Sequence, residues 1–231
     1  MGLFNVHTVS NAYRSDYFQY LSEQWATDDN EFTGMWNRDV TGAATIERVN
    51  TDIDMPKVSL TVPTSQSARL RSLYTFRVTP SKFSNTANTT MVRGVFLEFE
   101  AKLGNIANMD NATFFMGFND STTGTRATAN VVGFGLSSDA IQTITDSAGT
   151  ETVTSPSAIT LTDRNLYKIA ITEGQVEFWI NGNQVGTHTT NLPDVLPFLM
   201  FYNGSEATGA STLDVGFCHV FYRGFDDQRS F

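Results

Sequence analysis

The sequence predicts an all-β fold in which two antiparallel sheets pack face to face as a sandwich. From about residue 30 onward, roughly a dozen short runs alternate between polar and apolar residues, which is the period of a half-buried strand. Gly, Asn, Asp and Ser separate these runs at intervals of roughly 8–12 residues, as is typical of a sandwich. The hairpin at 165–203 shows both features most clearly.

The N-terminal segment has a different pattern. Residues 1–12 form a polar arm, and residues 13–25 carry the one helical pattern of the chain, which Ser15 could cap. We therefore divide the chain into an arm with a short helix at 1–29 and a β-sandwich at 30–231. The arm carries too many aromatic and apolar side chains for a solvated tail, which predicts that it packs against a partner. The predicted assembly residues are Phe4, Tyr17, Tyr20, Leu21 and Trp25.

The strands are predicted in chain order from the alternation and its breaks. The run 95–103 is the clearest, with Leu97 and Phe99 on the core face and Glu98 and Glu100 on the outer face. Polar loops are expected at 79–91 and 119–130, and a turn at 146–149. The other predicted strands are 33–36, 44–49, 58–62, 70–78, 113–118, 131–136, 140–145, 151–154, 167–172, 176–180, 198–202 and 213–222.

The hairpin also carries a resemblance. It has an aromatic-Lys-aliphatic strand at Tyr167-Lys168-Ile169, a turn at Gly174, the run Phe178-Trp179-Ile180-Asn181-Gly182, and an aromatic-rich strand at 198–202. This order resembles the signature hairpin of the concanavalin A-like, laminin-G-like jelly rolls. The resemblance implies an antiparallel jelly-roll sandwich. It implies no single function, because lectins, glycan hydrolases, adhesion modules and virion proteins share that fold.

The core is expected to rest on aromatic and aliphatic area, since the chain has one cysteine and can form no internal disulfide. In the run 213–222, alternation places Val215, Phe217, His219 and Phe221 on one face and Cys218, as a small apolar filler, on the other. The predicted core residues are Phe76, Phe99, Phe118, Ile169, Phe178 and Phe217.

Composition excludes several partners. The net charge of −9 argues against nucleic acid, and we interpret Arg69, Arg71 and Arg77 as solvated residues of a strand face rather than as a phosphate site. No apolar run approaches the roughly 20 residues of a membrane span, so no membrane partner is expected. A surface poor in charge without a secretory signal predicts a protein made in a host cytoplasm and displayed on a virion surface.

The candidate catalytic groups are two carboxylates, Glu98 and Glu100, on one strand face, as a glycosidase of this fold would use. The resemblance to laminarinase-like members implies three acids in alternation, and Lys102 occupies the third position. We therefore expect no enzymatic activity. Trp179, Glu98, Glu100 and Arg71 form the predicted set of glycan-contact residues.

For metal, Asp110, Asn119 and Asp120 offer the oxygen ligands that calcium prefers, although their spacing is not that of a dedicated loop. The expectation is no cofactor, with calcium as the alternative.

These inferences lead to a non-enzymatic virion structural protein, a capsid decoration or capsid-associated protein of a phage or an archaeal virus. It is expected to be a homo-oligomer that docks on capsid or tail proteins, with outer loops that contact host-surface glycans. The alternatives are a carbohydrate-binding module or lectin and a glycoside hydrolase.

Overall fold

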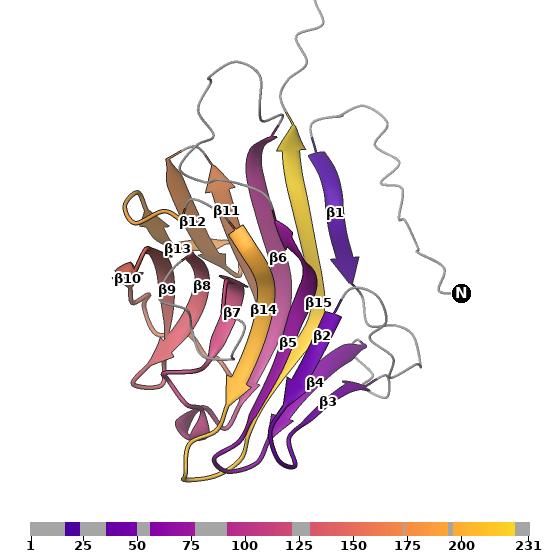
Figure 1. Ribbon diagram of the computed structural model, residues 1–231. Helices are drawn as coiled ribbons and strands as arrows, with labels where there is room; N and C mark the ends of the chain where they lie inside the picture. The colour runs from indigo at the N-terminus through magenta and orange to yellow at the C-terminus, as the bar shows by residue number, and fades with distance from the viewer. Residues whose placement is uncertain are drawn as a thin grey trace, which may run out of the picture.

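The computed structural model describes residues 17–23, 36–49, 56–76, 92–121, 130–172, 174–193 and 196–224. Within them the chain forms two antiparallel sheets that lie face to face (Figure 1), so the predicted sandwich is confirmed. The one helical turn among the described residues is the 3-10 helix η2 (Ile106–Asn108). It connects β6 of one sheet to β7 of the other. None of the described helices is long and apolar enough to cross a membrane.

The larger sheet has eight strands. Seven of them follow the order β13-β12-β11-β6-β15-β4-β3, and the eighth, β1, also pairs with β15. Its centre is the long pair β6 and β15, which run antiparallel over most of their length. The strands are β1 (Tyr17–Glu23), β3 (Thr45–Val49), β4 (Lys57–Val62), β6 (Val92–Gly104), β11 (Asn165–Thr172), β12 (Gln175–Ile180), β13 (Asn183–His188) and β15 (Ser211–Gly224).

The smaller sheet has seven strands in the order β10-β9-β8-β7-β14-β5-β2. Consecutive strands β7 to β10 form a meander, and β14 joins this meander to the early strands β5 and β2. The strands are β2 (Trp36–Val40), β5 (Ser67–Phe76), β7 (Phe115–Asn119), β8 (Val131–Ser137), β9 (Ala140–Ser147), β10 (Thr150–Thr154) and β14 (Leu196–Gly204).

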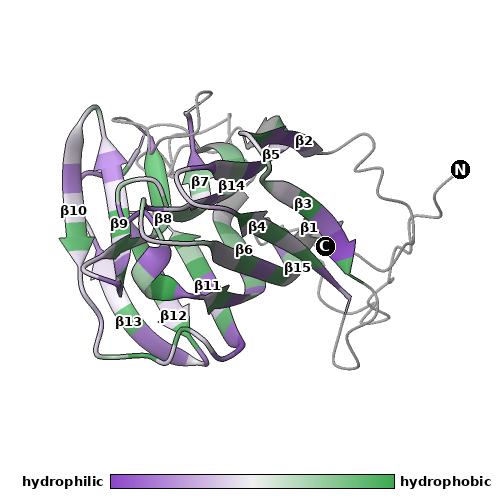
Figure 2. Cartoon of the chain, turned by 90° about the horizontal axis from the view of Figure 1, so that it is seen from below, coloured by the Kyte–Doolittle hydropathy of each residue, from purple (hydrophilic) through white to green (hydrophobic). Residues whose placement is uncertain are grey.

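The core lies between the sheets and is built by strict alternation. Figure 2 shows hydrophobic and hydrophilic residues alternating along strands such as β6 and β12. At the centre, the Phe99 ring stacks on Tyr167 at 5.1 Å and 8°, and the edges of Phe134 and Phe201 pack against Phe99 at 6.2 and 5.3 Å. The predicted burial of Phe99, Phe118, Ile169 and Phe178 is confirmed, whereas the side chain of Phe76 lies outside the described residues.

One predicted core residue is wrong. Phe217 was expected to share a face with Val215, but a bulge between them inserts Gly216 against Glu100 of β6. A single extra residue turns every later side chain to the opposite face. Val215 and Cys218 therefore both point into the core, and Phe217 points outward.

The helix predicted at 13–25 is also wrong, because residues 17–23 form strand β1, antiparallel to β15. The second half of β15 already presents backbone N–H and C=O groups beyond the end of β4, and pairing satisfies these groups. The tertiary partner thus overrides a weak local helical pattern. The division of the chain at residue 30 stays a prediction, as does packing of the arm against a partner; Phe4 and Trp25 lie outside the described residues.

We expect deletion of residues 1–25 to lower the melting temperature and to promote association. The deletion removes β1 and exposes the edge of β15 from Cys218 to Arg223, and an unpaired edge is a template for pairing with another chain. Thermal unfolding and size-exclusion chromatography would measure both effects. Deletion of residues 1–12 alone, which spares β1, is the control; equal behaviour of the two truncations would contradict this expectation.

Candidate functional site

The outward surface of the seven-stranded sheet gathers two cations and several aromatic rings on β5 and β14. Alternate residues of these strands, such as Leu70 and Phe201, are buried between the sheets, so their neighbours point outward. We call this surface the arginine face. It comprises Arg69, Arg71, Phe198, Met200 and Tyr202.

Arg69 lies at the centre of one row across this face. It is the direct cross-strand neighbour of Tyr202 on β14 and of Asp39 on β2. Its Nη2 donates to the Asp39 carboxylate. The side chain is only 7% exposed, and its other terminal nitrogen, Nη1, is buried with no hydrogen-bond acceptor among the residues that the structure describes. The sequence-based interpretation of Arg69 as a solvated cation is therefore wrong.

Arg71 lies one row further along β5. Its guanidinium carbon is 4.3 Å from the centre of the Phe198 ring, a cation–π contact, and its Nε is buried without an acceptor in the described part of the chain. Burial, and after it the nearby Arg69 guanidinium, lower the pKa of Arg71 from its ordinary value. An arginine stays protonated under such a shift, so this face holds two adjacent positive charges.

Two buried N–H groups without an acceptor are costly. Each such group forfeits roughly 1–3 kcal/mol of hydrogen-bonding free energy. The two adjacent guanidinium groups give this face a positive charge, which suits an anionic acceptor such as a carboxylate.

A buried apolar cluster lies on the same side of the sheet. Phe115, Val131, Ile144, Met200 and Tyr202 form this second cluster, separate from the core between the sheets. The Phe115 ring, the cross-strand neighbour of Tyr202, lies over Gly133, where an added Cβ would be 2.4 Å from the ring. The glycine thus makes room for an aromatic ring against the sheet.

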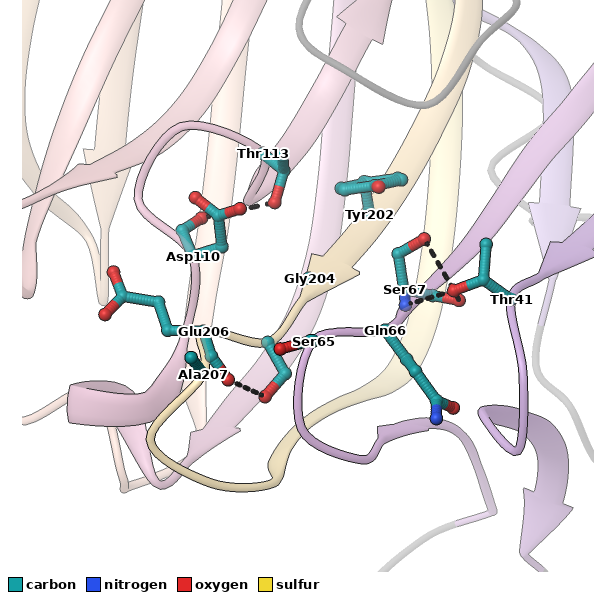
Figure 3. Close-up of a pocket in the computed structure, with 11 residues that line it drawn as sticks. Thr41, Ser65, Gln66, Ser67, Asp110, Thr113, Tyr202, Gly204, Glu206 and Ala207 are labelled. Carbon is teal, nitrogen blue, oxygen red and sulfur yellow. Dashed lines mark hydrogen bonds between the residues drawn. The ribbon is translucent and has the colours of Figure 1, made fainter.

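At one end of β5 and β14 this face runs into a pocket of about 520 Å³. Gly204 follows Tyr202 by two residues and Ser67 precedes Arg69 by two, so the pocket continues the same face of the sheet. Figure 3 shows the Tyr202 ring between Thr113 and Ser67 and above Gly204. We call this the end pocket; its polar lining includes Thr41, Ser65, Ser67, Asp110, Thr113 and Glu206.

Three of the four predicted glycan-contact residues lie together on the opposite side of the molecule. Trp179, Lys168 and Glu98 are consecutive cross-strand neighbours on β12, β11 and β6, on the outward surface of the eight-stranded sheet. Glu100 lies two residues further along β6. Arg71 is on the other sheet, so the structure does not bring the predicted set into one site.

Both glutamates are held by cations. Glu98 lies 3.6 Å from Lys168 Nζ, and Glu100 accepts a 2.8 Å hydrogen bond from Arg164 Nη1. His219, the other cross-strand neighbour of Glu98, lies between the rings of Phe217 and Phe221. This surface thus resembles a set of satisfied ion pairs more than a pair of carboxylates poised for acid–base chemistry.

The predicted metal ligands do not converge. Asp110 borders the end pocket, and its Oδ1 accepts a 2.9 Å hydrogen bond from the Ala112 N–H. Asn119 is the last residue of β7 and Asp120 follows it, where Asn130 donates to Asp120 and burial raises the pKa of that carboxyl group. Within the described ranges no three His, Cys, Asp or Glu side chains gather in a group that could hold a metal ion. The calcium alternative remains a prediction.

Sequence reasoning missed Arg69 and Tyr202 as site residues. A signal for Arg69 was present, since Arg69 and Arg71 alternate with the apolar Leu70 and therefore share one face. Nothing local indicated that Tyr202, which is 133 residues later in the chain (202 − 69), is paired with Arg69.

Comparison with known proteins gives the fold. No family model and no curated protein matches the chain. Among solved structures it is similar to one from a study of endo-acting O-glycanases with which human gut bacteria initiate mucin breakdown, at TM-score 0.56 and 10% identity over 89% of this chain and 99% of that one. It is also similar to the family 7 alginate lyase A1-II′, at TM-score 0.52 and 14% identity over 77% and 83%. A Bacillus licheniformis β-glucanase matches at TM-score 0.50 and 14% identity over 89% and 97%.

These likenesses confirm the antiparallel two-sheet jelly-roll sandwich. They also contradict the prediction that the chain is no enzyme, because the proteins that share its architecture include glycan-active enzymes such as the alginate lyases and the β-glucanase. That prediction rested on the acid missing at Lys102. The predicted virion and capsid roles gain no support and stay predictions.

Proposed function

We propose that this chain is a glycan-active enzyme whose substrate is an acidic polysaccharide bound along the arginine face. The observation that supports this most is the pair of adjacent guanidinium groups, Arg69 and Arg71, beside Tyr202 on one face of the sheet. A uronate carboxylate would complement this positive charge, and Arg71 is the less buried of the two cations. Phe198, which is half-buried beside Arg71, offers an aromatic ring to the apolar face of a sugar.

The reaction class that fits this face is β-elimination. In that reaction a base removes the proton next to a uronate carboxylate, and the glycosidic oxygen leaves with a proton. Arg69 and Arg71 would neutralise the carboxylate and stabilise the negative charge that develops on it. Tyr202 is the group beside them that can transfer a proton.

Hydrolysis by Asp39 and Asp146 together fits the geometry of this face poorly. Asp39 on β2 and Asp146 on β9 are carboxylates that alternation places on it, and five interstrand steps separate those strands. At about 4.8 Å a step this is roughly 24 Å, far beyond the roughly 5–10 Å of a glycosidase pair. Asp39 is bound to Arg69, and Asp146 accepts from the Gly149 N–H.

The experiment is incubation of the purified protein with polygalacturonate, alginate and hyaluronan, and with a neutral β-glucan. Elimination leaves an unsaturated uronate that absorbs in the ultraviolet, whereas hydrolysis gives only new reducing ends. We expect the ultraviolet product from at least one acidic polymer and none from the glucan. Tyr202→Phe should lower kcat by about 10²-fold or more, as loss of a proton-transfer group does.

Glu98→Gln on the opposite sheet is the matched control and should leave turnover unchanged. Two outcomes would overturn the proposal. The first is formation of new reducing ends without the ultraviolet product, if Glu98→Gln abolishes it; that result would place hydrolysis on the other sheet. Binding of every acidic polymer without turnover would remove the enzymatic role.

A further inference from the structure

The end pocket differs in charge from the face that it continues. On the arginine face, Arg69 lies two residues along β5 from Ser67 of the pocket. The described lining of the end pocket, in contrast, includes two carboxylates, Asp110 and Glu206, and no cation. Its remaining polar groups are neutral, mainly the hydroxyls of Thr41, Ser65, Ser67 and Thr113. A polymer lying along β5 and β14 therefore passes from a positive to a negative environment within about 7 Å, the rise of two strand residues.

The hollow is maintained by Gly204. An added Cβ at this position would lie 2.1 Å from Thr113 Oγ1, so a side chain here would have to displace the pocket wall. Thr113 itself is held by a 3.4 Å hydrogen bond from its hydroxyl to the Asp110 carbonyl. On the other side, the Ser67 N–H donates to Thr41 Oγ1 at 2.7 Å (Figure 3). The walls are thus anchored, and about 520 Å³ lies within the usual range for a ligand site, roughly 300–1,000 Å³.

We propose that the end pocket is a subsite for a sugar without a carboxylate, next to the uronate held by Arg69. This rests on the proposed function and names its substrate class: an acidic polysaccharide in which uronates alternate with uncharged or acetamido sugars. Hydroxyl side chains donate hydrogen bonds to sugar hydroxyls and accept hydrogen bonds from them, and carboxylates accept hydrogen bonds from them. A second uronate would instead bring its carboxylate toward Asp110 and Glu206, and like charges in a partly desolvated pocket repel.

The test compares two defined tetrasaccharides, one from hyaluronan, which alternates uronate and acetamido sugar, and one from polygalacturonate, in which every residue is a uronate. Calorimetric titration of the full chain with a chelator present gives both dissociation constants. We expect the alternating tetrasaccharide to bind about tenfold more tightly. Glu206→Gln removes one negative charge at an exposed position and should reduce this preference, mainly through tighter binding of the all-uronate ligand.

Glu47→Gln, the same change at an exposed position of the other sheet, is the control and should alter neither constant. Gly204→Ala should weaken binding of the alternating tetrasaccharide more than binding of the all-uronate one. The melting temperature of this variant reports whether the fold survives. Equal binding of the two ligands by the original chain, or a preference that Glu206→Gln leaves intact, would overturn this inference while the proposed function stands. Failure of both ligands and of the acidic polymers to bind would instead reject the proposed function itself.

Discussion

Replacing Phe178 with alanine is expected to lower the free energy of unfolding by about 3–5 kcal/mol, a large fraction of a typical domain's stability. The Phe178 ring is fully buried, packs against the edge of Phe134 at 5.4 Å, and lies 5.0 Å from the His188 ring. Phe178 and His188 are on the eight-stranded sheet and Phe134 is on the other, so truncation opens a cavity between the two layers. Urea unfolding would measure the loss.

The matched control is Phe217→Ala. It removes the same ring from the same sheet, but the bulge at Gly216 has turned Phe217 to the outward surface. We expect a markedly smaller loss, because little core volume is vacated. Equal losses for the two variants would mean that Phe217 is a core residue, as the plain alternation of the sequence predicted.

That comparison shows where sequence reasoning works and where it stops. The alternation correctly assigns the two faces of β6, β11 and β12, because β11 pairs with each of the other two in one register without a shift. It fails in β15, where one glycine shifts the register partway along the strand. Nothing in the local pattern marks Gly216 as a bulge rather than an ordinary strand residue.

Two strands were missed for a related reason. The run 183–188 is polar and contains Gly186, so it carries little strand propensity; β12 recruits it by hairpin pairing. Gly186 also lets β13 approach the other sheet, since an added Cβ would lie 2.8 Å from Thr143 Oγ1. β1 was mistaken for a helix because its partner, β15, is about 200 residues away in the sequence.

The candidate site was less predictable than the fold. Glu98 and Glu100 attracted attention because two acids in one short run are visible in the sequence, but the structure pairs both with cations. The arginine face depends on β5 and β14 becoming neighbours, which only the sheet order reveals. Burial of Arg69 is likewise a tertiary property, so its acceptor-free nitrogen could not be inferred from composition.

A second large effect is expected from His188, which is 1% exposed and bridges the two sheets from β13. Its Nδ1 lies 3.0 Å from Thr145 Oγ1, and its Nε2 lies 3.1 Å from both Thr143 Oγ1 and Thr154 Oγ1. Thr145 in turn donates to the Thr190 carbonyl, so its oxygen accepts from an Nδ1–H, and Thr154 can donate to Nε2. This network satisfies a neutral imidazole, and it offers only uncharged hydroxyls to an imidazolium.

Burial accordingly lowers the pKa of His188 from 6.5 to about 4. Between these values the unfolded chain binds a proton that the folded chain rejects, so the stability from His188 is complete above pH 6.5 and is lost as the pH falls toward 4. A shift of this size corresponds to about 3 kcal/mol. We expect the free energy of unfolding, measured in urea across this range, to decrease by about that amount from His188 alone.

His188→Gln tests this expectation, because glutamine keeps a donor and an acceptor but does not titrate. The variant should be less stable near neutral pH, and its stability should fall less steeply between pH 6.5 and 4. His219→Gln is the comparison: burial lowers the pKa of His219 too, but Glu98 opposes the shift, so a smaller change of slope is expected. An unchanged slope in His188→Gln would show that the folded protein accepts the imidazolium, and that the threonine network does not select the neutral ring.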